Sequence, residues 1–128
     1  MTDKKDEIEA LLNKSESKLK TARIDFDNGQ FDDSVSRSYY AVYHAISAAL
    51  LSKDMAFSSH SQTIGAFNKE FIKTEIWPKE FAGIIQGLFE DRQIGDYDAI
   101  ANIDEKTAKD NLNNAAKIVN KIKEFLMK

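Results

Sequence analysis

The feature that most restricts this chain is its near lack of residues that break helices. Its 128 residues include one proline and five glycines, and a proline inside a helix costs about 3 kcal/mol. No segment shows sustained alternation of apolar and polar residues, whereas apolar residues recur three and four positions apart almost throughout. The sequence therefore predicts an all-α protein. We expect one domain, residues 1–128, folded as an antiparallel helical bundle of four long helices plus one shorter helix.

Five segments carry the helical spacing, and each has a start or stop signal. We predict helices that begin at Thr2 or Asp3, near Asp32, at Ser59 with Gln62 as its capping-box partner, near Pro78 and at Asp104. Asn28-Gly29 ends the first helix and Ser52 the second. Because the connections are short, consecutive helices are expected to pack as antiparallel neighbours. The predicted core includes Tyr39, Ile46, Ile84, Leu88 and Val119.

Composition excludes several classes of protein. The chain has no cysteine, which rules out disulfides and thiolate nucleophiles. Two histidines without cysteine make a transition-metal site unexpected, and no phosphate-binding glycine loop is present, so we expect no metal and no cofactor. A net charge of −3 argues against a broad electropositive nucleic-acid surface but leaves room for a local basic site, and we expect no DNA partner. No apolar run approaches the roughly 20 residues of a membrane span. We expect a cytoplasmic protein without membrane contact.

The second predicted helix is apolar on one wide face and lined by small residues on another. Ser34, Ala41, Ala45 and Ala48 lie on this second face at helical spacing. Small side chains allow another backbone to approach closely. Either the helix lies centrally in the bundle, or this face forms the seam of a dimer.

Three polar residues share a stripe of the same helix. Arg37, Tyr40 and His44 lie at positions i, i+3 and i+7. An arginine, a tyrosine and a histidine that converge among alanines are suited to bind an anion or to transfer a proton. The alternative is a hydrogen-bonded cluster that only anchors neighbouring helices, and the sequence leaves both interpretations open.

A second unusual feature lies near the end of the fourth helix. Arg92 follows Leu88 on the apolar stripe, where an arginine must be paired, at a helix end or in a site. Asp96 at i+4 is its natural partner, so a simple intrahelical ion pair is the alternative to a functional role. We predict one polar cluster between the second and fourth helices, formed by Arg37, Tyr40, His44, Arg92, Asp96 and Tyr97. His60 is either a core or capping residue or a ligand-binding one.

Three stretches resemble a known family in order and spacing. Phe31–Leu50, FDDSVSRSYYAVYHAISAAL, resembles the second helix of small stand-alone prokaryotic HEPN-domain proteins. Ser58–Ser61 resembles the start of that family's third helix. Leu88–Tyr97, LFEDRQIGDY, is similar to its Arg-x-x-Ala-Asp-Tyr segment, with Gly95 in the alanine position. The resemblance runs from about Glu16 to Phe125.

The resemblance implies an antiparallel helical bundle that forms a two-fold homodimer. Many family members are toxins partnered by a small nucleotidyltransferase. Active members are metal-independent ribonucleases with an arginine, four to six residues, then a histidine. Here no histidine follows Arg92, and Asp96 and Tyr97 stand where the nuclease members have His-x-Tyr. Arg37 and His44 have the right spacing but lie on the second helix.

These observations define the candidate residues and three hypotheses. The candidate catalytic residues are Arg37, His44, Arg92 and Asp96, and the candidate ligand-binding residues are Tyr40, His60 and Tyr97. The first hypothesis is a component of a toxin–antitoxin-type module that binds a nucleotidyltransferase and also nucleotide or RNA. The second is a metal-independent ribonuclease. The third is a helical interaction subunit without a ligand.

Overall fold

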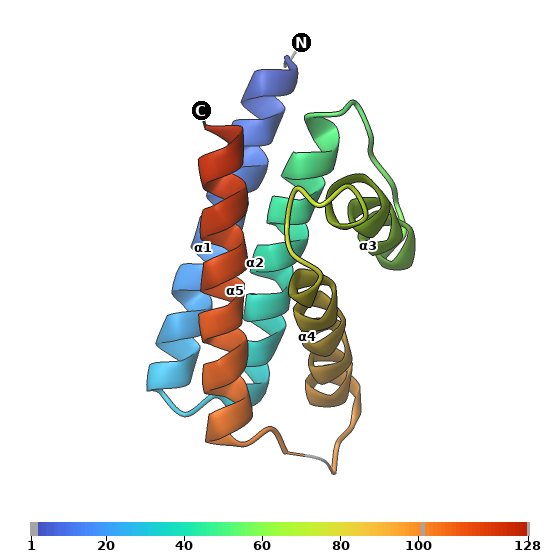
Figure 1. Cartoon of the computed structure of the whole chain (residues 1–128). Helices are drawn as coiled ribbons and strands as arrows, with labels where there is room; N and C mark the ends of the chain where they lie inside the picture. Colours follow the sequence, from blue (N-terminus) through green and yellow to red (C-terminus); the bar gives the residue numbers. More distant parts are fainter. Residues whose placement is uncertain (1–2, 101, 128) are drawn as a thin grey trace.

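The computed structural model describes residues 3–100 and 102–127, and in these ranges the chain is helical without strands. Its helices are α1 (Lys4–Asp27), α2 (Phe31–Leu51), α3 (His60–Phe67), α4 (Glu80–Tyr97) and α5 (Glu105–Leu126), with a π-helical turn, η1 (Asn68–Ile72), directly after α3 (Figure 1). This arrangement confirms the predicted bundle of four long helices and one shorter one. The π-helical turn is an additional feature that the sequence did not indicate.

The predicted start signals work as side-chain caps. The carboxylate of Asp3 accepts a hydrogen bond from the Asp6 amide at 2.8 Å, and Asp104 accepts one from the Thr107 amide at 2.8 Å. The Ser59 hydroxyl caps α3 by accepting from the amide of Gln62 at 3.2 Å. Each bond satisfies one of the free N–H groups in a first helical turn. The alternative cap, Thr2, lies outside the described residues.

Helix α2 is the centre of the bundle. It packs against α1, α4 and α5, and Figure 1 shows it between α1 and α4. Its small-residue face is buried against α1 of the same chain. There the Ser34 hydroxyl donates to the carbonyl of Ala22 at 2.8 Å, and the Ser15 hydroxyl donates to the carbonyl of Ala41 at 2.6 Å. Of the two interpretations of this face, the central position is therefore correct, and a dimer seam there is excluded because α1 already occupies it.

The core contains four of the five residues predicted for it. Tyr39, Ile46, Leu88 and Val119 are each at most 1% exposed. Ile84 is only half-buried, so its assignment to the core was wrong. Its neighbour Ile85 is buried instead, because α4 faces the bundle along Phe81, Ile85 and Leu88, and Ile84 lies about 100° around the helix from Ile85.

The connection from α4 to α5 departs from the expected antiparallel neighbours. Helix α5 packs mainly on α1 and α2, not on α4 (Figure 1). The connecting segment, residues 98–104, is long enough to carry the chain to the other side of α2. The carboxylate of Asp32, in the first turn of α2, accepts a hydrogen bond from the Ile103 amide at 3.2 Å and fixes this crossing.

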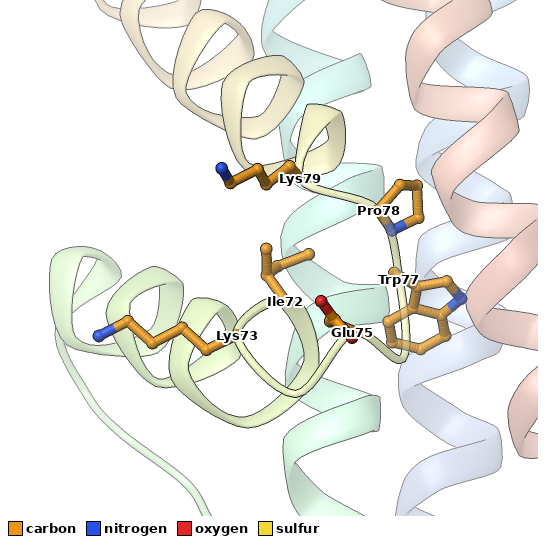
Figure 2. Close-up of a pocket in the computed structure, with 6 residues that line it drawn as sticks. All are labelled: Ile72, Lys73, Glu75, Trp77, Pro78 and Lys79. Carbon is orange, nitrogen blue, oxygen red and sulfur yellow. The ribbon is translucent and has the colours of Figure 1, made fainter.

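An aromatic cluster supports the junction between η1 and α4. Trp77 stacks on Phe67 with ring centroids 5.6 Å apart and lies 5.1 Å from the ring of Phe71. A hollow beside this junction is lined partly by Lys73 and Lys79, whose side chains extend away from Trp77 (Figure 2). It shares no residue with the predicted polar cluster, so we do not assign it a functional role.

Two glycines predict stability changes of opposite sign. Gly87 lies inside α4, and a methyl group added there would meet nothing within 4 Å. Gly87→Ala should therefore raise the free energy of unfolding by about 0.5–1 kcal/mol, because alanine loses less backbone entropy in a helix. Gly29 ends the α1 region with a φ of +73°. Gly29→Ala should cost about 1 kcal/mol through left-handed strain. Urea unfolding of both variants checks the two signs, and destabilisation by Gly87→Ala would contradict the open position of this residue.

Candidate functional site

The polar cluster centres on Arg92 of α4. Its Nη2 atom donates a hydrogen bond to the hydroxyl of Tyr40 at 2.7 Å and a longer one to the hydroxyl of Tyr97 at 3.4 Å. The Arg92 side chain is 12% exposed. Within the described ranges, its other terminal nitrogen, Nη1, donates to no protein group and is not enclosed. The guanidinium is thus held from one side while donors on the other remain available.

Asp96 forms an ion pair with Arg92 and compensates its positive charge. Its Nε atom lies 3.0 Å from Oδ2 of Asp96, one helical turn further along. The Nε–H group does not point at this oxygen, so the contact is an ion pair without an aligned hydrogen bond. The hydroxyl of Ser36 on α2 also donates to Asp96, at 3.5 Å. Tyr40 and Tyr97 accept from Arg92 and do not donate to it, because an arginine carries only donors.

Three tyrosine rings surround the guanidinium. Its carbon lies 5.2 Å from the ring centroid of Tyr40 and 5.5 Å from those of Tyr39 and Tyr97. Arginine beside the face of an aromatic ring is stabilised by the negative potential of the ring. Tyr97 is 73% exposed, so it forms the open edge of this arrangement, while Tyr39 and Tyr40 form its floor.

His60, the first residue of α3, joins the same arrangement. Its Nδ1 atom lies 2.7 Å from the hydroxyl of Tyr39, and its ring stacks on Tyr43 with centroids 4.2 Å apart. The hydroxyl of Tyr43 lies 3.3 Å from that of Thr63. We call the whole group the Arg92 site, and its members are Tyr39, Tyr40, Tyr43, His60, Arg92, Asp96 and Tyr97.

Electrostatics keep two members of the Arg92 site, Tyr39 and His60, neutral. Burial raises the pKa of the Tyr39 hydroxyl well above its ordinary value. Tyr43 and Tyr40 raise this pKa further by smaller amounts, whereas the positive charge of Arg92 lowers it. Burial, followed by the charge of Arg92, lowers the pKa of His60 below 6.5. At neutral pH the tyrosine stays protonated and the imidazole stays uncharged. The Tyr39–His60 contact is therefore a bond between two neutral groups.

His44 lies one turn beyond Tyr40 on α2. Its ring centroid is 6.3 Å from that of Tyr40 and 6.1 Å from that of Tyr43. Burial, and then the positive charges of Lys14 and Lys18, lower the pKa of His44 below 6.5. A neutral imidazole at the edge of the Arg92 site is in the correct state to accept a proton.

Arg37 is the one predicted member that lies elsewhere. Its Nε atom is 3.9 Å from Oδ2 of Asp25 on α1, and its side chain is 44% exposed. It therefore pairs with α1, and its placement in a cluster with Arg92 was wrong. The physical reason is that α1 presents a carboxylate beside this stripe of α2, and helical spacing alone does not reveal which neighbour carries the counter-charge. Tyr40, Arg92, Asp96 and Tyr97 do gather as predicted, with His44 at their edge beside Tyr40. The catalytic and ligand-binding roles remain predictions.

Sequence reasoning missed two tyrosines of the site. Tyr39 was predicted only as a core residue and Tyr43 was not among the candidates, and Tyr39 is indeed buried. A signal was available, because a buried tyrosine usually needs a hydrogen-bond partner for its hydroxyl. His60, which the sequence offered as a ligand-binding residue or a core or capping residue, supplies it.

The two histidines predict how stability depends on pH. Folding lowers the pKa of both His44 and His60 below the ordinary value of 6.5. As the pH falls through 6.5, the unfolded chain therefore binds more protons than the folded chain does. The histidines cost no stability above that pH, and stability declines below it until the pH has passed the folded-state pKa values. The melting temperature should fall between about pH 7.5 and about pH 5.5. The double variant His44→Gln/His60→Gln should show a shallower fall, and an unchanged slope would contradict this assignment.

The fold and site together describe a small all-α protein with an arginine-centred site between α2 and α4. The chain belongs to the HEPN domain family, whose model matches residues 8–125. It is 32% identical over 126 residues to a "UPF0332 protein" of Thermotoga maritima, covering 98% of this chain and 96% of the relative. It is 33% identical over 123 residues to "Putative toxin MJ0142" of Methanocaldococcus jannaschii, covering 96% and 84% respectively.

A solved structure supports the fold. The crystal structure of TT1696 from Thermus thermophilus superposes with a TM-score of 0.77 at 15% sequence identity, covering 91% of this chain and 96% of that one. The resemblance named from three sequence stretches is thus confirmed at the level of family and fold. In the part of the chain that the structure describes, no helix combines the length and apolar character needed to cross a bilayer.

Proposed function

We propose that this chain is the toxin-side HEPN component of a two-protein, toxin–antitoxin-type module in the cytoplasm, and that its Arg92 site binds a phosphate group of RNA or of a nucleotide. The observation that carries the proposal is the way in which the guanidinium of Arg92 is held. Three tyrosine rings and Asp96 hold its guanidinium, while Nη1 remains free to donate. A preorganised arginine is well suited to a phosphate because its donors match phosphate oxygens. Two curated relatives carry the name "Putative toxin".

The partner in this proposal is a small nucleotidyltransferase encoded in the adjacent gene, as the family resemblance implies. Co-expression with that gene, followed by affinity capture, tests it. We expect the two proteins to be recovered together and growth arrest caused by this chain alone to be relieved. If the adjacent protein neither binds this chain nor changes growth, the partner assignment is wrong.

Metal-independent ribonuclease activity is the second candidate function. One observation favours it, because the ring of Tyr40 is close to both Arg92, at 5.2 Å, and His44, at 6.3 Å. In this mechanism His44 accepts the proton of the 2′-hydroxyl while its oxygen forms a bond to phosphorus, and Arg92 stabilises the charge that develops on the phosphate. The bond from phosphorus to the 5′-oxygen of the next nucleotide breaks, and that oxygen takes a proton from water. His44→Ala should then abolish RNA cleavage with the fold retained by circular dichroism. Cleavage by that variant at the wild-type rate would assign the activity to other residues.

Homodimerisation is part of the proposal, since two-fold pairing is what the family resemblance implies. Light scattering at tens of micromolar should give twice the mass of the 14.5 kDa chain. A monomer at that concentration would contradict the dimer.

A further inference from the structure

The turn between α1 and α2, at the lower end of the bundle in Figure 1, contains a pair of residues suited to a chemical modification. Asn28 is the only asparagine in the sequence that a glycine follows. Asn28, Gly29 and Gln30 are all exposed to water. Because glycine has no side chain to shield its own backbone nitrogen, that nitrogen can reach the side-chain amide of the residue before it. This pair can therefore undergo deamidation.

The reaction needs water and no other reagent. The backbone nitrogen of Gly29 attacks Cγ of Asn28, and a bond forms between these two atoms. The bond from Cγ to Nδ2 breaks, and Nδ2 leaves as ammonia with the proton that the Gly29 nitrogen gives up. Water then opens the resulting succinimide ring at one of its two carbonyls. The product is aspartate, or isoaspartate in which the main chain runs through the former side-chain carbonyl.

Hydrogen bonds hold both reacting groups in the folded chain. Nδ2 of Asn28 donates to the carbonyl of Ile24 at 2.8 Å, and the amide of Gly29 donates to the carbonyl of Phe26 at 3.0 Å. Attack requires both of these bonds to break, so the reaction has to wait until the last turn of α1 opens. An exposed helix end opens at a much smaller cost in free energy than the whole domain. The folded structure therefore slows the modification without preventing it.

The product is unable to rebuild this turn. A carboxylate has no donor for the carbonyl of Ile24, and it places an acceptor against an acceptor. Its negative charge opposes the dipole at the C-terminal end of α1. Residues 24–33 already contain four aspartates and no lysine or arginine, so the new charge is repelled rather than paired. In isoaspartate the additional main-chain atom also displaces the amide of Gly29 from the carbonyl of Phe26.

We propose that Asn28 is a site of spontaneous deamidation, that opening of the last turn of α1 controls its rate, and that the product keeps this turn open. The inference is independent of the proposed function, because the turn shares no residue with the Arg92 site. It describes a change with time in the pairing of α1 with α2, the helix at the centre of the bundle.

The first test follows the modification itself by mass spectrometry. The full chain is kept at mildly alkaline pH, either native or in urea above its unfolding midpoint, and is then digested with trypsin. The peptide 24–37, IDFDNGQFDDSVSR, contains Asn28, and its mass rises when the amide becomes a carboxylate. The peptide 110–117, DNLNNAAK, is the internal control, because its three asparagines lie in α5 and none precedes a glycine.

We expect the Asn28 peptide to be modified before the control peptide in both samples, and about tenfold faster in urea than in the native chain. The variant Asn28→Gln should leave its peptide unmodified, because a glutamine would have to close a larger ring. Equal rates in the native and unfolded chains would show that opening of α1 does not control the reaction. Equally fast modification of the α5 peptide, or none at Asn28 in urea, would overturn the site.

The second test measures the effect of the product. Asn28→Asp reproduces one product directly and should lower the melting temperature by about 3–6 °C. The matched control is Asn13→Asp, which adds the same charge at an exposed position in the first half of α1 and should change it by no more than about 2 °C. Aged wild type should melt below fresh wild type, whereas aged Asn28→Gln should not change. Equal melting temperatures of Asn28→Asp and Asn13→Asp would contradict the proposed weakening of the turn.

Discussion

Ile46→Ala should lower the free energy of unfolding by about 2–5 kcal/mol. Ile46 is 1% exposed and lies at the centre of α2, the helix against which α1, α4 and α5 all pack. The substitution removes buried methyl groups and leaves a cavity that neighbouring helices fill only partly. Urea unfolding with a two-state fit measures the change, and the melting temperature should fall by roughly 2–6 °C for each kcal/mol lost.

The matched control for this prediction is Ile24→Ala. Ile24 belongs to α1 but is 51% exposed. The same chemical change there should alter the free energy of unfolding by no more than about 0.5 kcal/mol. A loss well under 1 kcal/mol for Ile46→Ala, or similar losses for both variants, would mean that α2 is not the centre of the bundle.

Arg92→Ala should lower stability by about 1–3 kcal/mol and abolish growth arrest. The substitution removes the donor to the Tyr40 hydroxyl and leaves the Asp96 carboxylate without its cation. It also removes the guanidinium from the three tyrosine rings. A destabilised protein that still arrests growth would assign Arg92 a purely structural role, which is the alternative that the sequence left open.

Arg37→Ala provides the comparison for Arg92. Its ion pair with Asp25 is long, at 3.9 Å, and only partly buried, with side chains 44% and 22% exposed. Exposed pairs contribute between 0 and about 1 kcal/mol, so this variant should melt close to the wild type and keep its effect on growth. Equal effects of the two arginine substitutions would contradict the distinction between them that the structure makes.

The helices were predictable because their signals are local. Asp3, Ser59 and Asp104 cap first turns through bonds that span three residues, and apolar spacing reflects the helix that carries it. The path of the α4–α5 connection was not predictable. It depends on Asp32, whose carboxylate accepts a hydrogen bond from an amide 71 positions away in the chain. It also depends on the preference of α5 for packing on α1 and α2 over α4.

The same distinction applies to the site. Asp96 was foreseen as a partner of Arg92 because the pair is separated by one turn of a single helix. The partner of Arg37 was not foreseen, because Asp25 reaches it from another helix. Tyr39 is both a core residue and a site residue: its ring is buried, whereas its hydroxyl bonds to His60. A prediction that assigns each residue to one face of a helix misses such a double role.

The most direct test of the proposed function is an induced-expression growth assay that compares wild type with Arg92→Lys. Lysine keeps the charge but lacks the planar fork of donors and the stacking surface of arginine. We expect the wild type to arrest growth, Arg92→Lys to lose that effect while remaining folded, and Arg37→Lys to behave like the wild type. Growth arrest by Arg92→Lys equal to that of the wild type, or no arrest by the wild type itself, would contradict a toxin that acts through the Arg92 site.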